Sequence, residues 1–510
     1  MGDKSTSGKM EFSINFGKAP ARIKRDSDTP FSIAVLGDFT GRASRGLSDA
    51  SQSRPVPIDT DNFEQKMEQL GIALQLPDPR NPGQMLELSF ASLEDFHPDQ
   101  LLKRVEPLVN LLQLRKKLAN PATAANAAAE LQNILGQSSA TPASDTSAPV
   151  GNESTDDTLA RLMGKPAGSP TASTPPTPAK GKGVNIDSLI KNIVGSSTVQ
   201  KPTTQQSAGL AALDLELASQ LRYILHHPHF QALESGWRAV DFLVRNLDSE
   251  ENLKLYLLDI SKDELAADLI PQTELQSAGT YASLYGQPYA LLVGNYAFDE
   301  SLMDLDVLRR MTTIASWLGA PFVAAASPHL VGCESFGSQN EPNNWTRPLP
   351  AESRQAWQAL RQSPEAAYLG LALPRFLLRQ PYGKGSDEIE TFSFEELSAP
   401  GDLHERYLWG NSGFLCAYVL TEAFKEDGWS LDPSGYGEIG DLPLHKFKQD
   451  GEMQVKPCAE AWLSIRAGDA ILSQGLMSVL SIKGNNSVRL ANLESVAQPT
   501  QPLAVHQANS

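Results

Sequence analysis

Hydrophobic positions form two patterned stretches, one before about residue 136 and one after about residue 208. In the first, FSIAVLGDF (31–39) is a short apolar run that ends at a Gly-Asp turn, which predicts a strand. FEQKMEQLGIALQL (63–76) predicts a helix that passes into a second strand. Farther on, Leu101, Val105, Leu108 and Leu112 follow helical spacing after Pro98, so we expect one helix with a packing face.

The second stretch alternates helical and strand-like patterns. Its opening helix places Leu210, Leu213, Leu217, Leu221 and Ile224 on one face. Strand-like runs follow at 253–260, 289–294 and 321–327, with a helical pattern at 301–319 between the last two. Such alternation predicts an α/β fold with a largely parallel sheet.

Residues 137–207 between the stretches are rich in Ser, Thr, Pro, Ala and Gly, and no aromatic residue occurs between His97 and Arg222. A segment of this composition buries too little apolar surface to offset its ordering entropy, so it predicts a flexible linker. About 70 such residues span roughly 40–50 Å. One island, 186–195, has Ile186, Leu189, Ile190 and Ile193 at helical spacing and predicts a short amphipathic helix, either without a partner or serving as a docking motif.

Charge and composition narrow the function. Sixty acidic and forty-three basic side chains leave a formal charge of -17, which disfavours binding to nucleic acid or anionic lipid and favours a basic partner. Three cysteines without CxxC spacing fit a reducing compartment. Neither a signal peptide nor a membrane-length apolar run is evident, so we expect a cytoplasmic protein without direct membrane insertion.

Catalytic and ligand-binding motifs carry little weight. His226, His227 and His229 invite a metal site, but Pro228 interrupts them and a helix-ending turn is the preferred interpretation. GYGEIG (435–440) has the letters of a dinucleotide loop without the preceding strand or the following helix. No phosphate loop, nucleophile elbow or HExxH helix occurs. We therefore expect no catalytic residue, no cofactor and no metal.

Two further residue sets have structural interpretations. Asp38, Glu94, Asp95 and Asp99 lie beside turns and a helix start, where capping and solvation explain them. The tryptophans all lie in the second stretch, where each predicts core or subunit contact. They are Trp237, Trp317, Trp345, Trp357, Trp409, Trp429 and Trp462.

The second stretch resembles the large sheath subunit of type VI secretion systems (TssC/VipB family). ILHHPHFQALESGWRAVDFLV (224–244) is similar to the family region in which a His-His-Pro turn leads to a Phe, a Leu-Glu pair and a Trp-Arg. The likeness continues in order through the segments 257–269, 288–298, 320–330, 366–383, 392–397, 406–414, 424–429 and 441–447.

The first stretch resembles the small sheath subunit (TssB/VipA family). The similar segments are FSIAVLGDFTGR (31–42), VPIDTDNFEQKMEQLG (56–71) and the region 92–120. Together the two resemblances imply a contractile-tail-sheath-like α/β fold with mixed α+β elements. Two co-folded blocks would be joined in one chain by a long disordered linker, which holds their ratio at one to one.

The resemblance implies a domain layout and a set of signature positions. The expected layout is an N-terminal extension (1–30), a small-subunit-like domain (31–136), the linker (137–207), a large-subunit-like domain (208–499) and a polar tail (500–510). The signature structural residues are Gly37, Asp38, Phe39, Asp95, Phe96, Pro98, His226, His227, Phe230, Glu234, Trp237, Arg238, Pro374, Arg375, Arg379, Pro381, Tyr382, Trp409, Gly428 and Trp429.

Partners also follow from the resemblance. It implies self-assembly or contact with other sheath subunits, an inner tube protein, baseplate components and an AAA+ ATPase that recycles contracted sheath. The island is similar to the segment that such an ATPase recognises, with Leu189, Ile190 and Ile193 as its apolar contacts.

The leading hypothesis is a structural sheath component that assembles around an inner tube and drives its ejection, and not an enzyme. Family large subunits continue past the segment similar to 493–499, whereas this sequence stops at Ser510. This departure keeps open an alternative, a non-contractile adaptor or end component at the baseplate or cap. A more distant alternative is a metal-dependent hydrolase.

Overall fold

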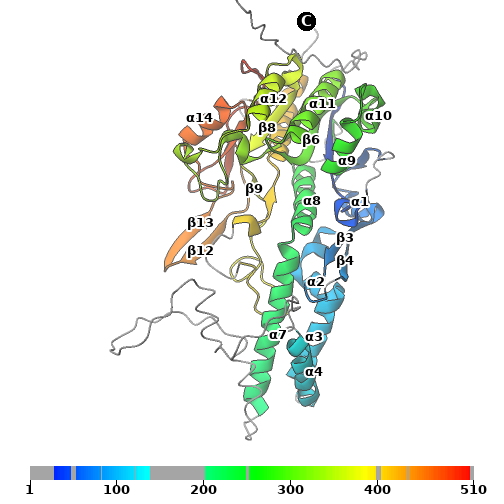
Figure 1. The fold of residues 1–510 in the computed structure, drawn as a ribbon, viewed down its shortest axis with the longest axis vertical. Coiled ribbons are helices and arrows are strands. Elements are labelled where there is room, and N and C mark those ends of the chain that lie inside the picture. The colour runs from blue at the N-terminus through cyan, green and yellow to red at the C-terminus, as the bar shows by residue number, and fades with distance from the viewer. Residues whose placement is uncertain are drawn as a thin grey trace, which may run out of the picture. The chain divides into compact units, whose positions relative to one another are not determined.

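A computed structural model describes residues 28–47, 53–81, 83–120, 122–137, 202–247, 252–397, 404–433 and 436–505 (Figure 1). These residues fall into two compact units. One contains the described parts of 1–109 and 218–510, and the other those of 110–217. The dividing points lie inside helices α3 (Glu106–Ala119) and α7 (Pro202–Leu225).

The larger unit is built around a nine-stranded sheet with the order β11-β15-β14-β8-β7-β6-β1-β5-β2. Its strands are β1 (Phe31–Gly37), β2 (Val56–Ile58), β5 (Leu253–Asp259), β6 (Tyr289–Phe298), β7 (Phe322–Ala326), β8 (Leu369–Leu373), β11 (Glu438–Ile439), β14 (Met477–Ser481) and β15 (Val488–Leu490). The pairings from β5 through β1, β6, β7 and β8 to β14 are parallel, and β2, β15 and β11 add antiparallel. The mixed α/β architecture and the largely parallel sheet are therefore confirmed.

Strand β1 comes from the first stretch of sequence yet lies between β5 and β6 of the second. Its register pairs Phe31 with Leu253 and Leu36 with Leu258 on one side, and Ile33 with Leu291 on the other. Every residue of β1 is buried, as expected for a parallel strand covered on both faces. The two stretches thus share one hydrophobic core.

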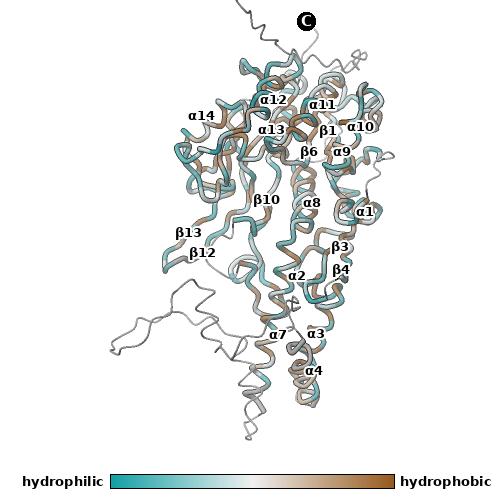
Figure 2. Tube along the Cα trace, viewed as in Figure 1, coloured by the Kyte–Doolittle hydropathy of each residue, from teal (hydrophilic) through white to brown (hydrophobic). Residues whose placement is uncertain are grey.

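Helices cover both faces of this sheet. The larger unit contains the helices α1 (Phe63–Leu70), α2 (Pro98–Arg104), α8 (Pro228–Leu247), α9 (Lys262–Leu269), α10 (Gly279–Leu284), α11 (Leu302–Leu318), α12 (Ala351–Arg361), α13 (Gly413–Asp427) and α14 (Ile465–Ser473). Of these, α8, α11, α13 and α14 contact strands of the sheet directly. Ala34 and Leu36 pack in one apolar cluster with residues of α9 to α12. Side chains alternate along a strand, so Ile33 and Val35 face the opposite side, where α13 contacts β1 and α8. In Figure 2 the hydrophobic colour gathers along β6 and α8.

Three two-stranded sheets complete the unit. They pair β3 (Ile72–Pro77) with β4 (Met85–Phe90), β9 (Phe376–Leu377) with β10 (Trp409–Gly410), and β12 (His445–Gln449) with β13 (Glu452–Lys456). Cys333, Cys416 and Cys458 are all buried as free thiols. No helix in the described part of the chain is both long and apolar enough to cross a bilayer.

The smaller unit contains α4 (Ala124–Gln137) with the adjoining parts of α3 and α7. Gly209 lets α7 approach α3 closely, because a Cβ there would lie 2.8 Å from a methyl group of Leu118. Nearby, Arg115 pairs with Asp214, and Gln206 donates to the Leu118 carbonyl over 2.7 Å.

Two expectations need correction. The helix expected through Leu101 and Leu112 is broken at Val105, which is extended (φ -78°, ψ 113°) between α2 and α3. Pro107 explains the break, since it lacks an N–H and its ring would clash with the carbonyl four residues earlier. In addition, residues 202–207, which composition assigned to the linker, belong to α7, where Pro202 suits a first helical position.

We predict that the two stretches stay associated after the covalent connection between them is cut. A protease site inserted after Val150 and then cleaved should leave both pieces in one peak on size exclusion, because β1 is bonded to β5 and β6 and fully buried. The same sample in denaturant should elute as two pieces, which controls for complete cleavage. Separation in native buffer would contradict the shared core.

Candidate functional site

The turn after β1 is tied to the second stretch by two acidic side chains. Asp259, at the end of β5, accepts hydrogen bonds from the amides of Phe39 (2.8 Å) and Thr40 (3.1 Å), and from the Thr40 hydroxyl (2.7 Å). Arg42 forms a forked contact with Glu264 at 2.7–3.2 Å. Bidentate, charge-assisted bonds of this kind are stronger than neutral ones and set the orientation of the turn.

An aromatic junction lies beside this turn. The indole of Trp237, fully buried on α8, donates to the Phe39 carbonyl over 2.8 Å. Its ring makes edge contacts with Phe39 at 5.7 Å and Phe63 at 5.6 Å. In the first turn of α8, Phe230 contacts Phe96 edge-on at 5.6 Å. Helix α8 therefore packs against aromatic side chains from the first stretch.

The first charged site, which we call the Glu234 cluster, comprises Glu234, Arg238, Arg379, Tyr382 and Glu396. Arg379 donates to Glu234 over 2.8 Å and to Glu396 over 2.7 and 3.1 Å. Arg238 also donates to Glu234 (2.8 Å), and the Tyr382 amide donates to Glu396 (2.8 Å). Glu234 is 0% exposed, Glu396 1% and Arg379 9%. These buried charges therefore neutralise one another where water cannot solvate them.

Electrostatics in the Glu234 cluster favour the ionised forms of Glu396 and Arg379. Burial alone would raise the pKa of Glu396, but the Arg379 charge and hydrogen bonds from Arg379 and the Tyr382 amide lower it to about 2. Burial would likewise lower the pKa of Arg379, yet the carboxylates of Glu234 and Glu396 raise it well above its usual range. Glu396 is thus held as a carboxylate and Arg379 as a guanidinium cation at neutral pH.

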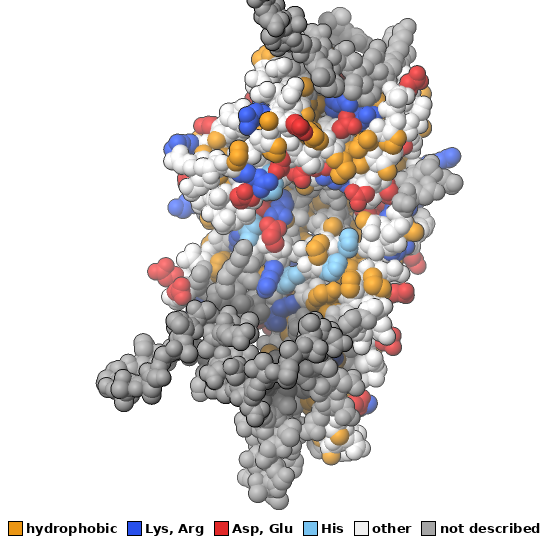
Figure 3. All heavy atoms as spheres, in the orientation of Figure 1, with side chains coloured by type: hydrophobic (Ala, Val, Ile, Leu, Met, Phe, Trp, Pro, Cys, Tyr) orange, Lys and Arg blue, Asp and Glu red, His pale blue; other side chains and the backbone are white. Residues whose placement is uncertain are grey.

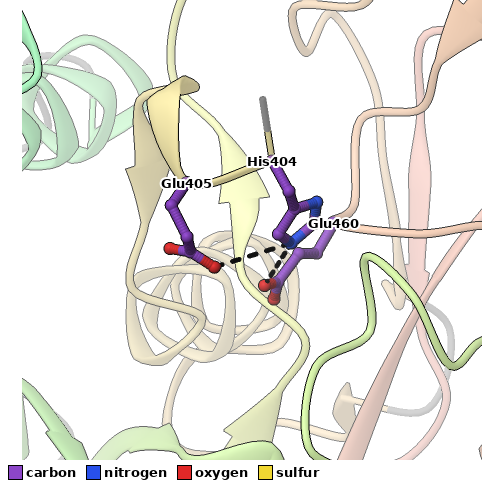
Figure 4. Close-up of side chains that lie close together, drawn as sticks. All are labelled: His404, Glu405 and Glu460. Atoms are coloured by element: carbon purple, nitrogen blue, oxygen red, sulfur yellow. Dashed lines mark hydrogen bonds and ion pairs between the residues drawn. The ribbon is translucent and has the colours of Figure 1, made fainter. Parts of the chain in front are cut away.

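The second charged site, the Glu460 cluster, comprises Arg375, His404, Glu405, Lys456 and Glu460 (Figure 4 shows its His404, Glu405 and Glu460). Arg375 pairs with both Glu460 and Glu405, and His404 Nε2 lies 2.9 Å from Glu460. Lys456 approaches His404 Nδ1 at 2.8 Å. Burial would raise the pKa of Glu460, but the Arg375 charge and the His404 hydrogen bond lower it to about 2.

His404, Glu405 and Glu460 are close enough to hold a metal ion, with one ligand atom each within 4.8 Å. The surrounding cations argue against that use. A Lys456 ammonium can only donate, so Nδ1 of His404 accepts and Nε2 carries the proton that faces Glu460. A metal would have to displace this proton and compete with Arg375 for both carboxylates. The arrangement is better suited to holding chain segments together than to ligating a cation.

Several signature residues belong to these sites. Glu234, Arg238, Arg379 and Tyr382 lie in the Glu234 cluster, and Arg375 lies in the Glu460 cluster, with its guanidinium 5.8 Å from the Trp409 ring centre. Pro381 accepts a hydrogen bond from Ser386 through its carbonyl, and Pro374 accepts one from Ser412.

Others lie at turns and helix ends. Asp38 accepts bonds from the amides of Arg42 and Ala43, while a Cβ on Gly37 would lie 3.0 Å from Asn295. Asp95 completes a capping box and pairs with Arg104, and Pro98 begins α2. These positions confirm capping for Asp38 and Asp95.

The capping and solvation expected for Asp99 are wrong, because His97 caps α2 and Asp99 is only 7% exposed. Asp99 accepts from the amide of Glu390 and the hydroxyl of Thr391, each over 2.9 Å, and so bonds to the second stretch. Near the start of β1, Gly428 ends α13 with φ 57°, and the Trp429 indole donates to the Thr29 carbonyl over 2.7 Å.

The histidine run forms the expected helix-ending turn, between α7 and α8. His226 Nε2 faces Glu396 at 3.6 Å, whereas His227 and His229 stack on each other at 5.4 Å. In the described part of GYGEIG, Glu438–Ile439 form β11 and pair with β15. Leu189, Ile190 and Ile193 lie outside the described residues.

Sequence reasoning missed the partners that complete these sites. Asp259, Glu264, Glu396, His404 and Glu460 were not singled out. Glu396 lies 162 residues from Glu234 along the chain, and no local pattern marks it as a partner. One signal was present, since Glu396 falls in the segment 392–397 that resembles the family.

Comparison with known proteins matches both stretches. The model of VipB, described as "EvpB/VC_A0108, tail sheath N-terminal domain", matches residues 207–497, and that of "Type VI secretion system, VipA, VC_A0107 or Hcp2" matches residues 9–145. The class is therefore that of type VI secretion sheath proteins. Because the VipB match covers more than half of the sequence, the chain belongs to the VipB tail sheath family.

Two curated relatives agree with this assignment, both from Pseudomonas aeruginosa. The sheath protein TssC1 is 35% identical over 317 residues, which are 59% of this chain and 64% of TssC1. The sheath protein TssB1 is 25% identical over 115 residues, which are 22% of this chain and 64% of TssB1. The chain thus spans less than two thirds of the length of either relative.

We predict that Glu396→Gln lowers the free energy of unfolding by about 3–5 kcal/mol, because Arg379 keeps only one buried carboxylate partner. The pH dependence should change as well. The pKa of Glu396 is lowered from 4.5 to about 2, so its stabilisation is complete above about pH 4.5 and is lost as the pH falls through about 2. Denaturant titrations between pH 7 and pH 2 should show a shallower acid loss for the variant.

Glu395→Gln is the matched control. Glu395 is the exposed neighbour of Glu396, so this substitution should change the unfolding free energy by less than about 0.5 kcal/mol and leave the acid slope unaltered. A Glu396→Gln chain with both the stability and the acid slope of the wild type would contradict the ion network.

Proposed function

We propose that the chain is a structural subunit of a type VI secretion contractile sheath, in which small-subunit and large-subunit portions are joined one to one. Copies assemble around an inner tube and contract to drive its ejection, and the protein catalyses no reaction. It works in the cytoplasm and meets baseplate components at the end of the assembly.

One observation carries this proposal. Strand β1, within the residues that match the VipA model, is the seventh strand of a sheet whose neighbouring strands β5 and β6 match the VipB model. A chain in which both portions complete one core is a single building block. Neither portion is an independently folded domain that is merely attached to the other.

The charged clusters support a mechanical role. They link α8, the segment after β9 and the segments around His404 and Glu460 through ion pairs made by the buried carboxylates of Glu234, Glu396 and Glu460. Buried, fully partnered ions of this kind hold elements in one arrangement, and removing one partner is costly. Rigid subunits are needed wherever assembly stores strain that a later transition releases.

We predict that the purified full chain forms helical filaments or tubes at raised protein concentration. Negative-stain microscopy combined with sedimentation provides the measurement, and a regular tube diameter distinguishes specific assembly from irregular aggregate. Particles that remain monomers or dimers over the whole concentration range would contradict the sheath assignment. They would favour an adaptor or end component.

We also propose that the island 186–195 docks onto an AAA+ recycling ATPase through Leu189, Ile190 and Ile193. Changing Leu189 and Ile193 together to Asp should abolish binding to the cognate ATPase ring in a pull-down, because the apolar face is lost. Asn192→Asp adds a charge beside the face without removing an apolar contact, and it should bind as the wild type does. Unchanged binding by the double variant would reassign the island as an inert linker segment.

A further inference from the structure

The hairpin formed by β12 and β13 has two unlike faces. One face is docked at its root, where the Tyr407 hydroxyl lies 2.9 Å from His445. On the same face Lys456 reaches His404 and lies 5.4 Å from the ring centres of both Tyr407 and Trp409. Because His445 and Lys456 are cross-strand partners, this face is held against the Glu460 cluster.

The opposite face carries a patch without such packing. Lys446 pairs across the hairpin with Val455, and Lys448 with Met453, so these four side chains share one face. Met453 is 58% exposed and Val455 is 38% exposed. In Figure 1 the hairpin projects away from the nine-stranded sheet.

The patch continues beyond the hairpin. The Trp462 indole donates to the Val455 carbonyl over 3.4 Å, and its side chain is 37% exposed. Ile465 is the first residue of α14, directly after the capping residue Ser464, and it is 78% exposed. We call Lys446, Lys448, Met453, Val455, Trp462 and Ile465 the hairpin patch.

Its composition is that of an interface. Four of the ten large hydrophobic side chains that are exposed among the described residues lie within the thirteen positions from Met453 to Ile465. Single exposed apolar residues are ordinary, whereas clustered ones mark contact surfaces, where Trp and Met are enriched. A two-stranded hairpin is also marginally stable alone, so a partner on its open face would stabilise it.

Charge identifies the partner. The hairpin patch contains two lysines and Arg466 follows it, while the acidic residues of the hairpin, Asp450 and Glu452, lie at its turn and on its other face. The whole chain carries a formal charge of -17. Another copy of this chain therefore has more acidic than basic side chains to offer as a binding surface. Figure 3 shows acidic side chains spread over the face in view. In a two-fold contact the hairpin patches of both copies would face each other, and the like charges of their lysines would disfavour binding. The contact therefore joins unlike surfaces.

We propose that the hairpin patch binds an acidic face of a second copy of this chain in a head-to-tail contact. This inference rests on the proposed function, because a contact between unlike surfaces propagates into an open helix or a ring. Lys446 and Lys448 steer the encounter, and Met453, Val455, Trp462 and Ile465 supply the apolar centre.

The test is site-specific photo-crosslinking in the full chain. A benzophenone amino acid at position 465 should give a covalent dimer, and digestion with mass spectrometry should map the link to a peptide outside residues 440–470. The same probe at Leu302, another exposed apolar position, controls for random collision. Lys446→Glu with Lys448→Glu should cut the dimer yield on the order of tenfold, whereas Lys103→Glu should not.

The outcomes separate this inference from the sheath assignment. Thermal unfolding should be unchanged in the charge variants, since the altered side chains are exposed. Tubes without a link from position 465 would overturn the hairpin patch and leave the sheath function standing. Links without tubes would support the patch and count against the sheath. A link from 465 to 465, or a monomer without any link, would overturn the head-to-tail contact.

Discussion

The insertion of β1 between β5 and β6 is the interaction on which the rest of the structure depends. It joins residues more than 200 positions apart, and it puts a strand of the first stretch at the centre of the core. The entropy of closing a long loop grows only slowly with its length, so a long connection between the stretches costs little more than a short one. What makes the insertion favourable is complete burial of β1, with its backbone paired on both sides.

The turn that follows β1 extends this coupling into the polar parts of the protein. Asp259 and Glu264 hold the turn in place. Within it, the Phe39 carbonyl accepts a hydrogen bond from the Trp237 indole of α8. The same helix carries Glu234 into its cluster with Arg379 and Glu396. Apolar and ionic contacts therefore meet on α8, and a change at either kind of contact is expected to disturb the other.

The two charged clusters differ in what they hold. The Glu234 cluster buries Glu234, Arg379 and Glu396 and stabilises the interior. The Glu460 cluster is partly open, with Glu405 67% exposed at the side chain, and through Lys456 it holds the root of the β12–β13 hairpin. A rigid base under a projecting hairpin keeps its outer face in a defined position, as a subunit contact requires.

Local sequence determined much of this protein: the strand at 31–37, the helix-to-strand passage through Gly71, the α11 helix, the capping by Asp38 and Asp95, and the turn at His226 and His227. Those features arise from neighbours along the chain, whose periodicity and capping chemistry can be read directly. The family resemblance also singled out Glu234, Arg375 and Arg379, but neither Glu396 nor Glu460. Only the tertiary structure decided that Glu396 and Glu460 neutralise those arginines, that β1 lies between β5 and β6, and that Val105 interrupts a helix. The reason is physical: strand order and ion pairing are set by which distant groups become buried together, and that information is shared between segments and contained in none of them alone.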